Sequence, residues 1–328
     1  MQLHQLAYFV AVADTRHFTH AAELLRVAQP SVSQQVRALE RDVGAELFHR
    51  IRGNLSLSEA GETLLPIARR ILADADAAYQ AVRELDELGR GRVRLGATPS
   101  LCTGLLPTVL AGFREARPGI ELMLRESGSR DLQTDVAEGL LDLAMIVDSR
   151  RRDHGRLATQ PLFVEELVVI SAKHRPAPVR RARMKIRDLE DRPLVMFRRG
   201  YDLRDATVDA CRAEGFEPSF AIEGGEMDAV LECVDAGMGI AVVPSTVAKD
   251  RFRVTRFEAP GLDRVVRLTY REEIKPSKAT LALHKAITDH VSTPGTLPRG
   301  TRPLLSRTLT STWHRDQGPA DAGKERRV

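Results

Sequence analysis

The chain has 328 residues, of which 43% are hydrophobic, so it can build two or three globular domains. Its three scattered cysteines fit neither a metal site nor an even disulfide framework, which favours a reducing, cytoplasmic compartment. The net charge of +4 comes from residues 291–328, with seven Lys/Arg and three Asp/Glu, so no global basic field argues for nucleic acid. The N-terminus lacks a signal-peptide pattern and no apolar run could span a bilayer, so no membrane partner is expected.

Residues 1–58 predict three short helices closed by a two-stranded ribbon. Leu3, Leu6, Phe9, Val10 and Ala13 recur at helical spacing. Thr19 is expected to cap a second helix, whose inward residues would be Ala21, Ala22, Leu24 and Leu25. The tight turn RVAQ follows, and Pro30 suits the first position of a third helix. Two short helices around a tight turn predict a helix-turn-helix.

The third helix is expected to bury one apolar face and to present a polar face without carboxylates in its N-terminal half. Amide side chains can pair with adenine, hydroxyl groups with most base edges, and guanidinium groups with guanine or phosphate. Arg50 and Arg52 flank Gly53–Asn54, a hairpin-turn signal, so both are expected on a wing that touches the DNA backbone or minor groove. A merely solvated helix face remains the alternative. The buried set would be Val32, Val36, Leu39 and Val43, and the polar set Gln29, Ser31, Ser33, Gln34 and Arg37.

Residues 59–88 predict one long helix within a linker of residues 59–90, and this helix is expected to be capped by Ser58 and ended by Gly89 and Gly91. Its apolar residues alternate in steps of four and three, the spacing of a coiled-coil seam. Because the helix would be roughly 45 Å long, a second copy is expected to cover the stripe, although packing on the chain's own N-terminal domain is the alternative. Pro66 is expected to loosen the first turns. The expected seam residues are Leu64, Ala68, Ile71, Ala75, Ala78, Val82 and Leu85.

Residues 91–290 alternate short apolar strands with helices, which predicts an α/β domain with doubly wound parallel sheets. The length of this region favours two lobes with a ligand cleft at the strand C-termini. Lobe I would comprise residues 91–161 and 267–290, and lobe II residues 162–266. Residues 291–328 are rich in Pro, Gly, Ser, Thr and Arg, and are predicted to be a disordered tail that exposes Trp313.

Hydroxyl side chains follow the first two strands of lobe I, where helix N-termini would favour an anion. From lobe II, the segment MFRRGYDLR brings aromatic and guanidinium groups, and the latter would suit a small carboxylate effector. Ordinary helix caps and solvated loop arginines are the alternative. No metal and no other cofactor is expected. The candidate effector-binding residues are Thr98, Ser100, Ser129, Phe197, Arg198 and Arg204.

The segments AQPSVSQQVRALE, GAELFHR and LSEAG, in this order, resemble the LysR-type transcriptional regulators. EGLLDLAMI and GMGIAVVP look like the effector-binding half of that family, so the resemblance covers residues 1 to about 290. It implies a winged helix-turn-helix, a linker helix and a two-lobed domain resembling type II periplasmic binding proteins. It assigns base and backbone recognition to Gln29, Pro30, Ser31, Ser33, Gln34, Arg37, Arg50 and Arg52, with Gln34 standing where many members carry a basic residue.

The resemblance implies a sequence-specific DNA-binding transcriptional regulator whose activity responds to a small-molecule effector. Its expected partners are double-stranded DNA with an inverted repeat, a second copy in a dimer that pairs into a tetramer, the effector, and RNA polymerase. A repressor that ignores ligands remains the alternative. An enzyme is disfavoured because no HExxH, GxSxG, Walker or CxxC motif occurs. An exported solute-binding protein would need a leader and no helical head.

Overall fold

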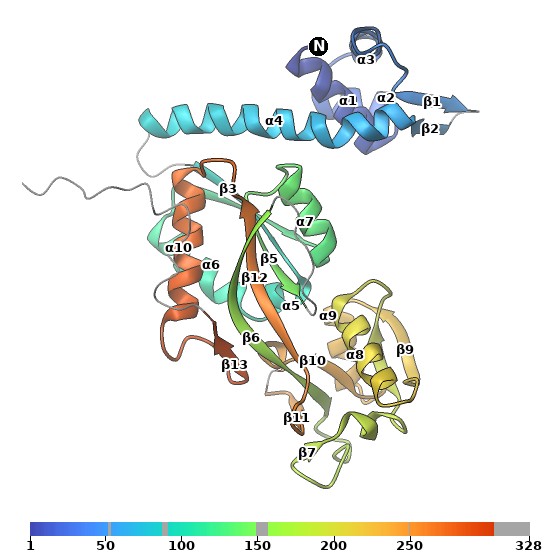
Figure 1. Ribbon diagram of the computed structural model, residues 1–328, viewed down its shortest axis with the longest axis vertical. Helices are drawn as coiled ribbons and strands as arrows, with labels where there is room; N and C mark the ends of the chain where they lie inside the picture. Colours follow the sequence, from blue (N-terminus) through green and yellow to red (C-terminus); the bar gives the residue numbers. More distant parts are fainter. Residues whose placement is uncertain (52–53, 87–90, 149–156, 249, 305–328) are drawn as a thin grey trace, which may run out of the picture.

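The computed structural model describes residues 1–51, 54–86, 91–148, 157–248 and 250–304 (Figure 1). A small helical head lies at one end of the molecule, the long helix α4 (Glu59–Asp86) lies beside it, and a two-lobed sheet domain fills the rest. The expected winged helix-turn-helix, linker helix and two-lobed C-terminal domain are confirmed. Within the described residues, no helix is both long and apolar enough to cross a membrane.

The head consists of α1 (Leu3–Thr15), α2 (Phe18–Leu25), α3 (Gln29–Val43) and an antiparallel ribbon of β1 (Phe48–Ile51) and β2 (Asn54–Leu57). These elements close on one core because each helix has an apolar face. The largest side chains of that core with less than 2% exposure are Leu6, Phe9, Leu39 and Leu47.

Several local expectations for the head are wrong. His17, and not Thr19, caps α2, because its Nδ1 accepts the Thr19 N–H at 3.1 Å. Pro30 occupies the second position of α3, which begins at Gln29. Asn54 is paired with Ile51 in the ribbon and therefore does not belong to the turn. Two residues expected to face inward are exposed instead, Leu24 by 67% and Val43 by 40%, and Leu3 of the helical-spacing set is 45% exposed.

The expected seam on α4 divides between two environments. Ser58 caps the helix as predicted, since its Oγ accepts the Gly61 N–H at 3.0 Å. Ala68 is fully buried in the head core, and Leu64 and Ile71 pack against that core. The prediction of a seam open to a partner is therefore wrong for Ala68, which the head covers completely, whereas Leu64 and Ile71 are half-buried. Farther along, Ala75 is half-buried, Ala78 is exposed, Val82 is 64% exposed, and the side chain of Leu85 lies outside the described part.

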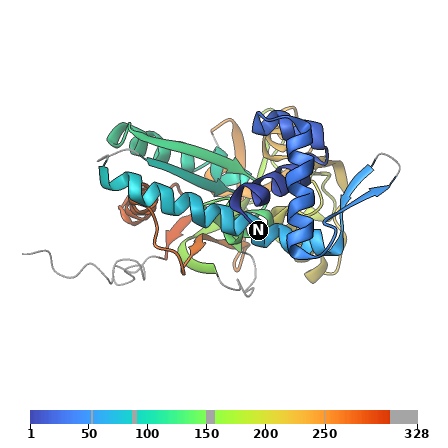
Figure 2. The ribbon, with the colours of Figure 1, turned by 90° about the horizontal axis from the view of Figure 1, so that it is seen from above.

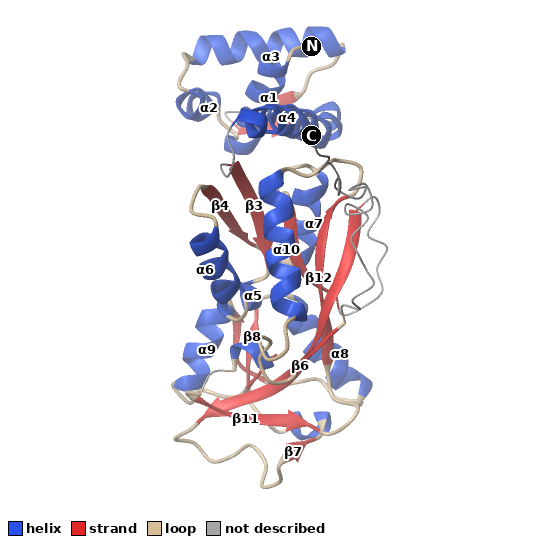
Figure 3. Cartoon of the chain, turned by 90° about the vertical axis from the view of Figure 1, so that its left-hand side faces the viewer, coloured by secondary structure: helices blue, strands red, loops and turns tan. Residues whose placement is uncertain are grey.

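Lobe I is built on the parallel strands β4 (Ile120–Glu126), β3 (Gly91–Ala97) and β5 (Leu143–Asp148), flanked by α5 (Pro99–Thr103), α6 (Leu106–Ala116), α7 (Ser129–Ala137) and α10 (Lys278–Ser292) (Figure 3). The next strand, β12 (Asp263–Arg271), is antiparallel to both β5 and β6 (Leu157–Ala172). The sheet is therefore mixed, and the expectation of purely parallel sheets is wrong for its central strands. The alternation rule missed this because β6 and β12 are long strands that pass between the lobes.

Lobe II contains β7 (Arg183–Met184), β8 (Leu194–Phe197), α8 (Asp202–Ala213), β9 (Phe220–Gly225), α9 (Met227–Asp235), β10 (Ala241–Pro244) and β11 (Phe252–Phe257). β8 and β9 are parallel, whereas β10 and β11 both pair with β6 in the antiparallel direction. Figure 1 shows that the 16-residue strand β6 runs from one lobe into the other.

Part of the predicted tail is ordered. The strand β13 (Thr301–Pro303) pairs with β6, with Thr301 opposite Glu165. The Glu166 N–H donates to the Gly300 carbonyl at 2.8 Å, and the Leu304 N–H donates to the Leu162 carbonyl at 2.9 Å. The prediction of disorder is therefore wrong for the residues up to 304, because backbone pairing does not depend on apolar side chains. Residues 305–328, with Trp313, lie outside the described part.

Helix α4 lies against lobe I as well as against the head (Figures 1 and 2). Arg69 joins all three parts, bonding Asp14 of α1 at 2.5 Å and Glu138, just after α7, at 2.6 Å. Gly139 adopts φ +75°, and a Cβ there would come within 2.4 Å of the Ala73 Cβ. This close approach requires glycine, so the linker helix is seated on lobe I by shape as well as by charge.

Candidate DNA-binding surface and effector cleft

Helix α3 begins at a sharp turn that leaves its N-terminus free. Arg26 ends α2 in the left-handed conformation with φ 56°, and its N–H donates to the Ala22 and Glu23 carbonyls. Ala28 precedes α3 without a side-chain cap, and the first turn of α3 contains no acidic residue. The partial positive charge of the helix N-terminus is therefore not compensated by the helix's own side chains, and such a terminus suits a phosphate.

The outward face of α3 carries the side chains predicted to read DNA. Val32, Val36 and Leu39 are fully buried on the opposite face, which fixes the rotation of the helix. In Figures 1 and 3, α3 lies on the side of the head that faces away from the two-lobed domain. Gln29, Pro30, Ser31, Gln34 and Arg37 are exposed there, and Ser33 is half-buried. The Arg50 side chain and Arg52 lie outside the described part.

The two lobes meet at a hydrogen bond between hydroxyl and carboxylate. Ser129 Oγ, at the start of α7, donates to Asp202 Oδ2, at the start of α8, over 2.7 Å. Ser129 Oγ also accepts the Val147 N–H at 3.2 Å. The small space between the lobes is lined by Asp202 and Val147 together with Thr98, Pro99, Ser100, Gly128, Tyr201 and Arg264. That space measures about 10 Å³, which is roughly the room for one water molecule.

A buried ion pair supports one wall of this cleft. Arg264 of β12 and Glu165 of β6 are only 4% and 0% exposed, and Arg264 Nη2 lies 2.7 Å from Glu165 Oε2. The same nitrogen donates to Ser100 Oγ at 2.8 Å, and Ser100 Oγ is 3.5 Å from Thr98 Oγ1. The Thr246 N–H donates to the other oxygen of Glu165 at 3.2 Å. Buried charges require partners of this kind, so Arg264 is held rigidly at the cavity wall.

Tyr201 offers an unused polar group at the same place. Its ring stacks on Phe197 with centroids 4.7 Å apart. Burial raises the pKa of its hydroxyl above the usual range, so the group stays protonated. Among the described residues, its buried hydroxyl oxygen has no hydrogen-bond partner. A buried donor without a partner is costly, and a ligand or a water would satisfy it.

The structure brings together only half of the predicted effector residues. Thr98 and Ser100 line the cavity, and Ser129 hydrogen-bonds Asp202, which also lines it. Phe197 is 1% exposed in the core of lobe II. Arg198 pairs with Glu226, and Arg204 pairs with Glu223 at 2.8 Å, so neither arginine lines the cavity.

Sequence reasoning did not select Asp202 or Arg264, although both line the cavity. The sequence position of Arg264 could have identified it, because an arginine at an inward position of a strand, here β12, needs a buried partner. Asp202 was harder to identify from the sequence, because an acidic residue in the first turn of a helix is an ordinary feature.

A helix-turn-helix head with a free reading helix, a long linker helix and a two-lobed domain with a polar cleft define a ligand-responsive DNA-binding protein. Residues 3–62 match the family described as "Bacterial regulatory helix-turn-helix protein, lysR family", and residues 86–292 match "LysR substrate binding domain". The chain therefore belongs to the LysR family. It is a DNA-binding transcriptional regulator with an effector-binding domain.

Two curated relatives and two solved structures show how far the likeness extends. The chain is 32% identical to the "Transcriptional dual regulator GltC" of Bacillus subtilis (strain 168), over 86% of this chain and 93% of the relative. It is also 32% identical to a "Probable hydrogen peroxide-inducible genes activator" of Mycobacterium avium, over 81% of this chain and 86% of the relative.

Among solved structures, a full-length OxyR variant from Pseudomonas aeruginosa has a TM-score of 0.68 at 24% identity, covering 92% of this chain and 98% of that one. Full-length CbnR in complex with its target DNA has a TM-score of 0.65 at 23% identity, covering 88% and 99%. At these identities, the two structures establish the shared fold.

Proposed function

We propose that the head reads an inverted-repeat operator through the exposed face of α3. Gln29, Ser31, Ser33, Gln34 and Arg37 would contact base edges and phosphates, Pro30 would set the start of the helix, and Arg50 and Arg52 would contact the backbone from the wing. The exposure of Gln34 beside the uncapped N-terminus of α3 supports this assignment. Two copies are required for an inverted repeat, and the exposed half of the α4 stripe is the surface that would join them.

We further propose that the effector is a small carboxylate that replaces Asp202 on Ser129. The bond between Ser129 Oγ and Asp202 Oδ2 carries this proposal, because lobe I already holds a carboxylate there. Arg264 and the unpartnered Tyr201 hydroxyl lie at the same cavity and would complete the binding of an anion. Since the space of about 10 Å³ is too small for a ligand, the effector must bind to an opened cleft and stabilise it.

Calorimetric titration with a panel of small mono- and dicarboxylates tests the effector proposal. Ser129→Ala should abolish the heat of the binding member. Ser127→Ala is the matched control, because Ser127 Oγ bonds Asp131 and does not line the cleft. Equal loss in both variants, or no binding by any member of the panel, would favour the alternative of a repressor that ignores ligands.

A peroxide-sensing function is the second candidate, raised by the name of the mycobacterial relative. Such chemistry needs a thiolate. Burial, aided by Glu126, raises the pKa of Cys102 to about 12, and burial raises that of Cys211 to about 11. These two of the chain's three thiols are therefore poor sensors, which supports our proposal that this regulator responds to a bound ligand. We also propose that it acts in the cytoplasm, contacts RNA polymerase and catalyses no reaction.

A further inference from the structure

A second polar cavity lies where the linker helix meets lobe I, apart from the cleft between the lobes. It measures about 70 Å³ and is bordered by the second half of α4, the start of β3, the segment after β12 and the start of α10. Since one water molecule needs roughly 10–15 Å³ of such space, the cavity has room for about five heavy atoms. That is the size of a tetrahedral oxyanion.

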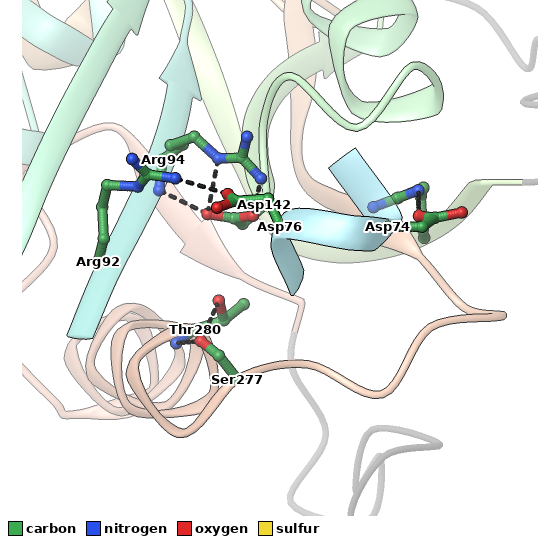
Figure 4. Close-up of polar contacts among 8 residues, drawn as sticks. Asp74, Asp76, Arg92, Arg94, Asp142, Ser277 and Thr280 are labelled. Atoms are coloured by element: carbon green, nitrogen blue, oxygen red, sulfur yellow. Dashed lines mark hydrogen bonds and ion pairs between the residues drawn. The ribbon is translucent and has the colours of Figure 1, made fainter. Parts of the chain in front are cut away.

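The charges around this cavity do not balance. Arg92, Arg94, Arg271 and Lys275 line it, whereas the carboxylates that line it are Asp76 and Asp142. Figure 4 shows the hydrogen bonds and ion pairs of these two carboxylates. Arg94 bonds both oxygens of Asp142, with the shorter side-chain contact at 2.7 Å, and Arg92 bonds Asp76 at 2.6 Å.

The excess positive charge of the cavity comes from Lys275, because Arg271 also has a carboxylate partner. Arg271 bonds Asp74, which does not line the cavity, at 2.8 Å. Lys275 is exposed and makes no hydrogen bond or ion pair with any residue that the structure describes. An anion would give Lys275 a partner and could also contact the three arginines, each of which already pairs with a carboxylate.

Helix α10 adds to the attraction. Ser277 and Thr280 at its start line the cavity, and Ser277 Oγ accepts the Thr280 N–H at 3.1 Å. The first turn of α10 contains no acidic side chain, so no carboxylate of the helix itself offsets its positive end.

We propose that this cavity binds a phosphate group, either as free inorganic phosphate or as part of a small phosphomonoester. The dianion would be held by Lys275, Arg92 and the start of α10. It would compete with Asp76 of α4 for the Arg92 guanidinium, so its binding weakens one of the contacts that seat the linker helix on lobe I. By linkage, phosphate binding and the seating of α4 oppose each other.

Titration of the full chain with inorganic phosphate at constant ionic strength, followed by calorimetry and by the melting temperature, tests this site. Wild type should bind saturably in the millimolar range. Lys275→Gln should weaken the affinity about fivefold, the effect of losing one partly exposed charge-assisted hydrogen bond. Lys173→Gln is the control, since it removes the same charge from an exposed lysine at the far end of β6 and should bind like wild type.

A second pair of variants moves the affinity in the other direction. Asp76→Asn removes the competing carboxylate and should tighten phosphate binding severalfold, whereas Glu115→Gln on the exposed face of α6 should not. Repetition with glycerol 3-phosphate separates the sources of the ligand: tighter binding assigns a phosphomonoester, and equal or weaker binding assigns free phosphate. The proposal is wrong if wild type shows no saturable binding, or if either control changes the affinity as much as its partner variant.

Discussion

Ser129 Oγ donates a 2.7 Å hydrogen bond to Asp202 Oδ2, and this bond joins the first helix turn of α7 in lobe I to that of α8 in lobe II. Val147 completes the link from the lobe I sheet through its N–H. The cleft is closed by a carboxylate of the protein itself. An effector must therefore compete with an internal group, and its apparent affinity depends on how often the lobes part.

Asp202→Ala should make the cleft open more often. Loss of a hydrogen bond to a charged group costs about 1.5–3 kcal/mol, so the open population should rise at least tenfold. The amide of Val147, which bonds Ser129 Oγ, should then exchange faster with deuterium. Asp205→Ala removes the other acidic side chain from the first turn of α8 and is the control for helix-dipole effects. The same exchange rate in both variants would count against the interlobe bond.

Gln34→Ala should relax the choice of one base pair. A bidentate amide–adenine contact contributes about 1–3 kcal/mol of discrimination, so this preference should vanish while binding to other positions persists. Gln35→Ala is the natural control, because the Gln35 amide oxygen lies 3.1 Å from His4 Nε2 within the head. Competition binding on operators selected from a random DNA library measures both variants. Retained discrimination by Gln34→Ala would remove this residue from base recognition.

Val82→Asp should dissociate the dimer without unfolding the head. Val82 is 64% exposed on α4, so a carboxylate is tolerated in the monomer but would be buried between two copies. Met238→Asp places the same charge on a 53% exposed apolar residue of lobe II and should leave the assembly unchanged. Sedimentation at micromolar concentration distinguishes them. A dimer that survives Val82→Asp would mean that the exposed half of α4 is not the contact.

Ala68→Leu tests the other half of the same stripe. Ala68 is fully buried in the head core, so a larger side chain should overpack it and lower the unfolding free energy by about 1–3 kcal/mol. The variant should remain a dimer wherever it is folded. Chemical denaturation followed by circular dichroism measures the loss. Unchanged stability would show that Ala68 faces a partner instead of the head.

Cys102 and Cys211 should resist oxidation and alkylation in the native state. With pKa values of about 12 and about 11, no more than about one thiol in 10⁴ is ionised at pH 7. The folded pKa values of the two thiols lie above the ordinary 9.0. The contribution of these thiols to the free energy of unfolding is therefore full below pH 9 and is lost as the pH rises towards 11 or 12. Mass spectrometry after peroxide and iodoacetamide treatment checks reactivity, with denatured protein as the labelled control. Rapid peroxide modification of either native thiol would revive the sensor hypothesis.

The pattern of the sequence was most informative where a local rule decides the structure. Val32, Val36 and Leu39 follow helical spacing and are buried, and Ser58 precedes its helix as a cap, because both rules act within one or two turns. The pattern failed at α2 because the helix begins at Phe18, so that Thr19 lies inside the first turn and His17 Nδ1 accepts the Thr19 N–H. It also failed for the tail segment, whose strand is held by backbone bonds to residues far away in the chain.

By itself, the sequence determined the order of the parts, the polar face of the reading helix and the two-lobed class of the effector domain, since these depend on periodicity and short motifs. Only the tertiary structure decided that Ser129 hydrogen-bonds Asp202 and that Arg264 hydrogen-bonds Ser100. It also decided that the α4 stripe divides between the head and solvent. Each of these contacts joins residues on different elements. Long-range packing selects such pairs, and no local period encodes them.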